Sequence, residues 1–296
     1  MRPVDRRNFL SISALLGGSV LSNQLLAQEP PASTPSEPVY RVSKNVELGR
    51  QQPDEAEHPL DPALKIAYSS LKNIQSSIHD YTAIVIKREQ IGGTLGDYEY
   101  MGVKVRNRKM QNGQIVTPFS VYTAFLKPAA VKGREAIYIE NQNDGKLVAH
   151  EGGMKGRFLP TVDLDPHGLM AMRGQRYPIT DLGIENLVVK LIEKGERDRQ
   201  RDECVVEFLK GAKVGGRECT VLSVKHPVPR PYFDFCHAQI FIDNELNIPV
   251  RYSAHTWPTT PGGEPQLLEE YTYQNIKLNV GLDDIDFDRN NPKYKF

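Results

Sequence analysis

The sequence lacks the short motifs that mark most hydrolases and nucleotide-binding enzymes. Its 296 residues contain no G-x-S-x-G elbow, no Walker-type phosphate loop, no G-x-G-x-x-G and no H-E-x-x-H. The glycine-rich stretch at residues 92–96 has no helix after it to offer amides to a phosphate, so it is predicted to form a hairpin turn. We therefore expect no cofactor and no enzyme of these classes.

Cysteine is also scarce. The chain has three cysteines, Cys204, Cys219 and Cys236, and no C-x-x-C pair among them. This spacing argues against a zinc ribbon and against a thioredoxin-type site. One disulfide with a leftover thiol and three buried thiols are both compatible with the sequence.

Neither an excess of charge nor a long apolar run is present. The 37 Lys and Arg residues balance the 37 Asp and Glu residues, so net charge gives no reason to expect nucleic acid as a partner. The apolar run near the N-terminus is too short and too weak for a transmembrane segment.

This apolar run comes directly after Arg6-Arg7-Asn8-Phe9-Leu10, which resembles a twin-arginine export signal. The alternative is a general secretory signal. We predict a signal peptide at residues 1–27 and a soluble protein in the periplasm or otherwise exported.

Residues 28–59 are rich in Pro, Glu, Ser and Gln and poor in large apolar residues, which predicts a disordered linker.

A single folded domain is expected at residues 60–296. Its first element is predicted to be an amphipathic helix that starts at Asp61-Pro62, with the Asp61 side chain as its cap. The helix would carry one apolar stripe made of Leu64, Ala67, Leu71, Ile74 and Ile78.

A second amphipathic helix is predicted at residues 180–195, with Thr180 or Asp181 as its cap. Its apolar stripe consists of Ile184, Leu187, Val188, Leu191 and Ile192. Elsewhere, from residue 81 on, the apolar residues mostly alternate with a period of two, which indicates about ten strands. The connections are short and turn-like, such as Asn143-Asp144-Gly145, and short connections favour antiparallel pairing. The fold class is therefore α+β, mostly β.

The stretch TPFSVYTAFLKP at residues 117–128 is apolar on both faces of its predicted strand. A strand of this kind needs apolar cover on both sides of the sheet. Two amphipathic helices can plug one face of a curved antiparallel half-barrel sheet, and a strongly curled sheet can then enclose an apolar cavity. The alternative is that sheet and helices fill each other completely and leave no cavity.

If the cavity exists, strand and helix residues of the apolar stripes are its candidate ligand-binding residues. From the strands these are Phe119, Val121, Tyr122, Phe125, Leu126, Ile137 and Ile139, and from the helices Leu64, Leu71, Leu187 and Leu191.

The segment VDLDPHG is the strongest candidate for a polar site. Asp163, Asp165 and His167 are two residues apart, so an extended chain would project all three from one face. Their oxygen and nitrogen atoms could hold a divalent cation. Because Pro166 bends the chain between them, we expect no metal there, and an exposed Asp163 with Asp165 capping the next turn is the simpler interpretation.

The runs EYMGVKVR, PFSVYTAFLKP and GREAIYIENQNDGKLVAHEGG and the C-terminal region resemble the bacterial exported proteins of domain of unknown function family 1571. The second half is also similar to the periplasmic lipoprotein-carrier and lipoprotein-sorting superfamily. The similar features are the turn from Asp243 to Pro249 and a tail with Asn279, Gly281, Asp284 and Phe287. This resemblance implies a half-barrel of antiparallel strands plugged by helices, with an apolar cavity for acyl chains.

The sequence thus predicts an exported, non-enzymatic binding protein for an apolar ligand, either a lipid or the acyl chains of a lipoprotein. Two alternatives remain open. One is a structural or protein-binding module of the cell envelope without a ligand, and the other is a metal-assisted hydrolase that uses Asp163, Asp165 and His167.

Overall fold

The computed structural model describes residues 40–41, 57–156, 158–201, 203–260 and 262–296. The signal peptide predicted at residues 1–27 and most of the predicted linker lie outside these ranges. Within the linker, Tyr40–Arg41 forms a short strand, β1, that pairs with Lys213 and Val214.

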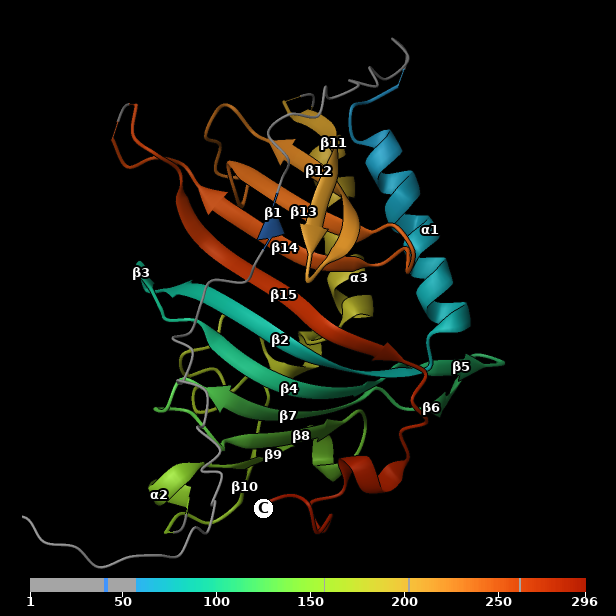
Figure 1. Cartoon of the computed structure of the whole chain (residues 1–296), viewed down its shortest axis with the longest axis vertical. Coiled ribbons are helices and arrows are strands. Elements are labelled where there is room, and N and C mark those ends of the chain that lie inside the picture. The colour runs from blue at the N-terminus through green and yellow to red at the C-terminus, as the bar shows by residue number, and fades with distance from the viewer. Residues whose placement is uncertain (1–39, 42–56, 157, 202, 261) are drawn as a thin grey trace, which may run out of the picture. The chain divides into compact units, whose positions relative to one another are not determined.

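Thirteen strands form one antiparallel sheet (Figure 1). Its order is β1-β11-β12-β13-β14-β15-β2-β4-β7-β8-β9-β10, with β3 paired to β2 beside this path. The path ends at β1 and β10, so the sheet is not closed into a barrel. The strands of the sheet that follow β1 are β2 (Asp80–Ile91), β3 (Thr94–Leu95), β4 (Glu99–Arg106), β7 (Ser120–Lys127), β8 (Glu135–Ile139), β9 (Leu147–His150), β10 (Val162–Leu164), β11 (Val205–Val214), β12 (Arg217–Lys225), β13 (His237–Asp243), β14 (Pro249–Thr256) and β15 (Gln266–Leu278).

The remaining elements are short, apart from two long helices. A hairpin of β5 (Lys109–Gln111) and β6 (Gln114–Thr117) stands outside the main sheet. The helices are α1 (Asp61–Ser77), α2 (Gly153–Gly156) and α3 (Ile184–Arg199), and 3₁₀ turns occur at Asn143–Gly145, Ile179–Asp181 and Asp284–Phe287. The fold is the predicted one, a mostly β half-barrel with two long helices.

One long strand joins the two halves of the sheet. Strand β15 pairs with β14 on one side and with β2 on the other, so residues near the C-terminus lie beside the first strand of the domain. The half formed by β2, β4, β7, β8, β9 and β10 and the half formed by β11–β14 are therefore parts of one continuous surface.

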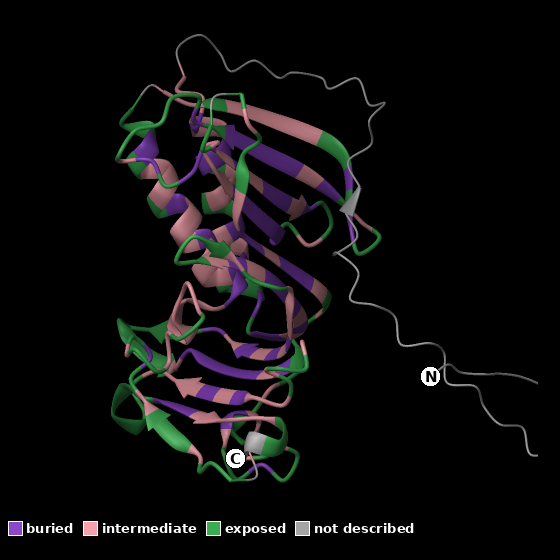
Figure 2. Ribbon diagram, turned by 90° about the vertical axis from the view of Figure 1, so that its left-hand side faces the viewer, coloured by how far each residue is buried: buried purple, intermediate pink, exposed green. Residues whose placement is uncertain are grey.

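Helices α1 and α3 pack side by side against one face of this sheet, which we call the inner face (Figure 2). Leu64 of α1 packs in a cluster with Leu222, Ile240 and Tyr252 of β12–β14. Ile74 of α1 and Val188 of α3 belong to a second cluster that reaches β2, β4 and β7. The amphipathic stripes predicted from the sequence are the faces that the helices bury.

The outer face of β7–β9 is covered by the C-terminal segment, residues 282–296. Tyr122, Ile137 and Val148 form a buried cluster with Phe287. The ring of Tyr122 also stacks on that of Tyr294, with 3.9 Å between the ring centroids. This segment explains why the strand at residues 120–127 is apolar on both faces.

Both helix caps predicted from the sequence are wrong. Helix α1 has Leu60 at its N-cap, and the Asp61 carboxylate instead accepts a hydrogen bond from the His58 N–H, at 3.1 Å. Helix α3 starts after Gly183, because Thr180 and Asp181 lie in the preceding 3₁₀ turn. The buried N–H of Ile184 donates to the Tyr81 hydroxyl at 2.8 Å, so a strand residue satisfies the helix terminus.

Candidate functional site

A cavity of about 820 Å³ lies over the inner face of the sheet, beside α3. Its floor is formed by β2, β4, β7, β8, β9, β10 and β15, and its walls by residues 159–183 and one side of α3. The volume is in the range of ligand-binding cavities, roughly 300–1,000 Å³. The sheet and helices therefore do not fill each other completely.

Two cross-strand rows make most of the cavity floor apolar. Directly paired residues of neighbouring strands share one face of a sheet. One row consists of Tyr273, Val85, Met101 and Phe125, which pair in that order across β15, β2, β4 and β7. The next consists of Thr123, Ala136, Ala149 and Val162 across β7–β10. All eight line the cavity.

The floor becomes polar on one side of the apolar rows. Tyr252, Tyr271, Lys87 and Glu99 form the adjacent row across β14, β15, β2 and β4. Glu269 and Glu89 pair with each other two residues further along β15 and β2. All six residues line the cavity. The cavity therefore has an apolar region and a charged end.

Lys87 is the centre of the charged end. Its side chain is only 5% exposed. The ammonium group donates to Glu89 Oε2 at 2.8 Å and to Gln175 Oε1 at 2.6 Å, and it lies 3.2 Å from Glu99 Oε2. Its three donors thus have three partners, which is what a buried ammonium requires.

Glu269 is the most deeply buried carboxylate of this end, with 1% of its surface exposed. Its Oε1 accepts hydrogen bonds from the hydroxyls of Tyr177 at 3.1 Å and Tyr252 at 3.3 Å. Its Oε2 lies 2.8 Å from Arg176 Nε, but neither atom has a hydrogen-bond partner of suitable geometry.

The tyrosines of this end remain protonated donors. Burial, and after it the charge of Glu269, raises the pKa of both Tyr177 and Tyr252 above the usual tyrosine range. Burial, followed by the charge of Glu89, does the same for the pKa of Tyr271. Tyr271 donates to Glu89, so each of the two paired carboxylates receives a hydrogen bond from tyrosine.

A short segment, residues 174–178, crosses the charged end and is here called the strap. Gln175, Arg176 and Tyr177 supply the contacts to Lys87 and Glu269 described above. The backbone N–H of Arg176 also donates to Glu89 Oε2 at 3.2 Å. The strap therefore contacts the sheet through several polar groups, and the ring of Tyr177 also contacts that of Tyr271.

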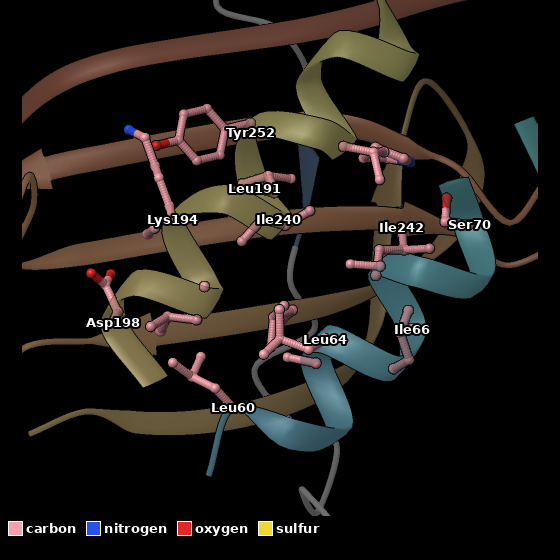
Figure 3. Close-up of a pocket in the computed structure, with 18 of the residues that line it drawn as sticks. Leu60, Leu64, Ile66, Ser70, Leu191, Lys194, Asp198, Ile240, Ile242 and Tyr252 are labelled. Atoms are coloured by element: carbon pink, nitrogen blue, oxygen red, sulfur yellow. The ribbon is translucent and has the colours of Figure 1, made fainter. Parts of the chain in front are cut away.

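The structure distributes the predicted ligand-binding residues over several places. Phe125, Leu187 and Leu191 line the large cavity. Leu64 and Leu191 line a smaller cavity of about 80 Å³ between the helices and β12–β14 (Figure 3). The other predicted residues lie away from both cavities: Phe119, Val121 and Leu71 in the core around α1 and α3, Tyr122, Ile137 and Ile139 on the outer face, and Leu126 exposed near the end of β7.

The predicted polar segment at residues 163–167 is not assembled into a site. Asp163 accepts hydrogen bonds from Asn143 at 3.1 Å and Arg289 at 2.5 Å. The Asp165 carboxylate accepts the backbone N–H of His167 at 2.9 Å. Among the residues that the structure describes, no group of three or more His, Cys, Asp and Glu side chains could hold a metal ion.

Two of the residues that carry the superfamily resemblance, Asn279 and Asp243, stabilise turns. Asn279 accepts the His79 N–H and donates to the Ser77 carbonyl, both at 2.8 Å, which links the end of α1 to the end of β15. Asp243 accepts the N–H groups of Glu245 and Leu246 at 2.9 Å. Both side chains therefore hold connections between secondary-structure elements in place.

The structure also bears on the cysteines and on membrane-spanning segments. Cys219 and Cys236 are buried, and the described part of the chain contains no disulfide bond. No helix in that part is long and apolar enough to cross a membrane.

The open antiparallel sheet, the two helices on its inner face and the cavity define a helix-plugged half-barrel. The family described as "Protein of unknown function (DUF1571)" matches residues 78–296, and the chain belongs to this family. No curated protein matches the chain.

Several solved structures have a related outline. A DUF1329 family protein from Desulfovibrio piger is 12% identical, with a TM-score of 0.38 over 79% of this chain and 98% of the other. A putative outer membrane lipoprotein-sorting protein domain from Vibrio parahaemolyticus is 14% identical, with a TM-score of 0.37 over 77% and 96% of the two chains. The Pseudomonas aeruginosa MucA/MucB complex contains a chain that is 13% identical, with a TM-score of 0.40 over 76% of this chain and 60% of the other.

Proposed function

We propose that this domain binds an amphiphile, a lipid or an acylated protein segment, without transforming it chemically. The observation that carries the proposal is the cavity of about 820 Å³ with its apolar rows and its charged end. An apolar chain would lie over the rows that contain Val85, Met101 and Ala149, where it is removed from water. The headgroup would lie toward Lys87 and Glu269.

The proposed location is outside the cytoplasm. The twin-arginine-type segment at residues 6–10 supports export of the folded protein. An exported protein that shields an apolar chain would act as a carrier or holder of that chain between aqueous and membrane environments.

The first test is mass spectrometry of an organic extract from full-length protein purified after native export. We expect one class of amphiphile in near-equimolar amount. An empty extract, together with no binding of a fluorescent fatty acid by the extracted protein, would contradict the proposal and favour an envelope module without a ligand.

A substitution on the cavity floor provides the matched test. Ala149 is half-buried and faces the cavity, so Ala149→Trp places a large ring across the apolar row. We expect this variant to lose most of the bound amphiphile at unchanged folding. Ala129→Trp is the control, because Ala129 is exposed in the turn after β7 and does not line the cavity.

A further inference from the structure

The charged end of the cavity has more carboxylates than cations on the sheet itself. At this end the floor contributes Glu89, Glu99 and Glu269 but only Lys87 as a positive group, while Glu135 of β8, which also lines the cavity, accepts the Lys295 N–H at 2.8 Å. Arg176 of the strap brings the second positive charge, 2.8 Å from Glu269. The other charged pairs of the cavity stand at its rim and pair among themselves: Arg134 with Glu151, Lys190 with Asp181 and Lys194 with Asp234. Arg173, a further lining residue, is exposed.

The contact between Arg176 and Glu269 is incomplete. Glu269 is buried, yet its Oε2 accepts no hydrogen bond, and Arg176 Nε donates none. A buried carboxylate oxygen without a hydrogen bond is costly, so a better donor would be favoured at this position. The atom belongs to a residue that lines the cavity.

Aromatic residues surround the Glu269 carboxylate, whose other oxygen, Oε1, accepts hydrogen bonds from Tyr177 and Tyr252. Tyr252 and Tyr271 stack with 6.4 Å between their ring centroids, and Tyr177 lies 6.3 Å from Tyr271. Tyrosine faces attract cations, and all three rings line the cavity around the carboxylates. The guanidinium of Arg176 already lies over the ring of Tyr177, at 5.9 Å from its centroid.

We propose that the ligand carries a cationic ammonium headgroup, which binds at Glu269 among these tyrosines in place of the Arg176 side chain. This inference rests on the proposed function and adds the charge of the headgroup to it. The strap then has a defined role: Arg176 neutralises the site while it is empty and moves aside when the ligand's own cation arrives. An anionic headgroup would instead meet three carboxylates.

The test compares two amphiphiles of equal chain length, dodecylammonium, whose headgroup carries three N–H donors, and dodecanoate, below their micelle concentrations. Isothermal titration calorimetry on the full-length, lipid-extracted protein gives both affinities. We expect the cationic amphiphile to bind at least about tenfold more tightly, the factor given by one moderate charge interaction. If neither amphiphile binds, the proposed function itself fails. If dodecanoate binds equally well or better, the function stands and the headgroup inference is overturned.

Two variants test the roles of Glu269 and Arg176 separately. Glu269→Gln should reduce the preference for the cation at least about tenfold and leave dodecanoate affinity the same or higher. Arg176→Gln removes the competing guanidinium at a half-buried position, so it should tighten the binding of dodecylammonium severalfold. Weaker cation binding by Arg176→Gln would overturn the inference even if Glu269→Gln does not fold. Glu245→Gln is the control, since it removes an exposed charge that is paired with Arg217 away from the cavity, and it should change either affinity less than about fivefold.

Discussion

Lys87 joins three parts of the molecule through one buried ammonium group. Its partners are Glu89 on its own strand, Glu99 on the neighbouring strand and Gln175 on the strap. A buried ion pair adds little net stability when it is complete, because desolvation offsets the attraction between its charges. Removing one partner is different, because the charges that remain are buried without compensation.

We therefore predict that Lys87→Met is strongly destabilising. Glu89 is 8% exposed and would lose its ammonium partner, so the free energy of unfolding should fall by about 3–5 kcal/mol. Urea unfolding measures this change. Lys109→Met, at an exposed position of β5, should change it by less than about 0.5 kcal/mol. A loss below about 1 kcal/mol for Lys87→Met would show that the charges are not buried as described.

His237 gives the protein a predicted sensitivity to acid. Burial, followed by the nearby charges of Lys225 and His255, lowers the pKa of His237 from 6.5 to about 4. The unfolded chain therefore binds a proton between these two pH values while the folded chain does not. The contribution of His237 to the free energy of unfolding is therefore fully present above pH 6.5 and is lost as the pH falls toward 4.

The prediction is that His237→Gln loses less stability on acidification than the wild-type protein. The difference should be about 2 kcal/mol between pH 7 and pH 4.5, measured from urea midpoints at several pH values. His167→Gln is the control, because His167 is exposed. Parallel curves for His237→Gln and wild type would mean that His237 is protonated in the folded state near its usual pKa.

At the scale of the elements, α3 depends on β2 for its first hydrogen bond. Gly183 at its N-cap has no side chain that could cap the helix, and its φ of 124° is a conformation that favours glycine. The hydroxyl of Tyr81, which is fully buried, accepts the Ile184 N–H. The same contact fixes where α3 lies over the sheet.

Tyr81→Phe should remove this hydrogen bond, because it deletes the hydroxyl and leaves the rest of the side chain unchanged. The N–H of Ile184 would then be buried without a partner, which costs about 1–3 kcal/mol of unfolding free energy. Urea unfolding with an unchanged m value would show that the loss is in stability alone. Tyr68→Phe, on the exposed side of α1, is the control and should cost less than about 0.5 kcal/mol. A similarly small cost for Tyr81→Phe would contradict the proposed anchoring of α3.

The elements could be predicted well from the sequence because their signals are local. The stripe from Leu64 to Ile74 and the stripe from Ile184 to Ile192 both correspond to buried helix faces. The helix caps could not be predicted, because the partner of Ile184 is 103 residues away, on a strand. Local spacing suggested Thr180 and Asp181 instead, and these residues form a separate turn.

The cavity could be predicted only in part, since its floor depends on strand register. Phe125, Leu187 and Leu191 were predicted as lining residues from their apolar character alone. The charged end was missed, because Lys87, Glu99 and Glu269 are ordinary charged residues until pairing places them on one face. The one available signal was that Lys87 and Glu89 lie two apart in a strand and share a face.

On the scale of the whole domain, the two halves of the sheet have different cover. The inner face of β12–β14 packs on α1 and α3 through a contiguous apolar cluster. The inner face of β8–β10 instead borders the large cavity, with residues 159–183 opposite it. Local stability follows the number of buried apolar contacts, so the two halves should open with different free energies.

Hydrogen exchange measured by mass spectrometry should reveal this difference. In lipid-extracted protein, we expect the amides of β8, β9 and β10 to exchange faster than those of β12, β13 and β14, because their inner face lacks a packed partner. A bound amphiphile would fill the cavity and stabilise only the folded state, so it should slow exchange in β8–β10 and in the strap. The Ala149→Trp variant should show no such slowing when the amphiphile is added, while Ala129→Trp should behave as wild type. Equal protection in both halves, unchanged by amphiphile, would mean that the cavity is closed by packing in solution and that the domain acts through its surface.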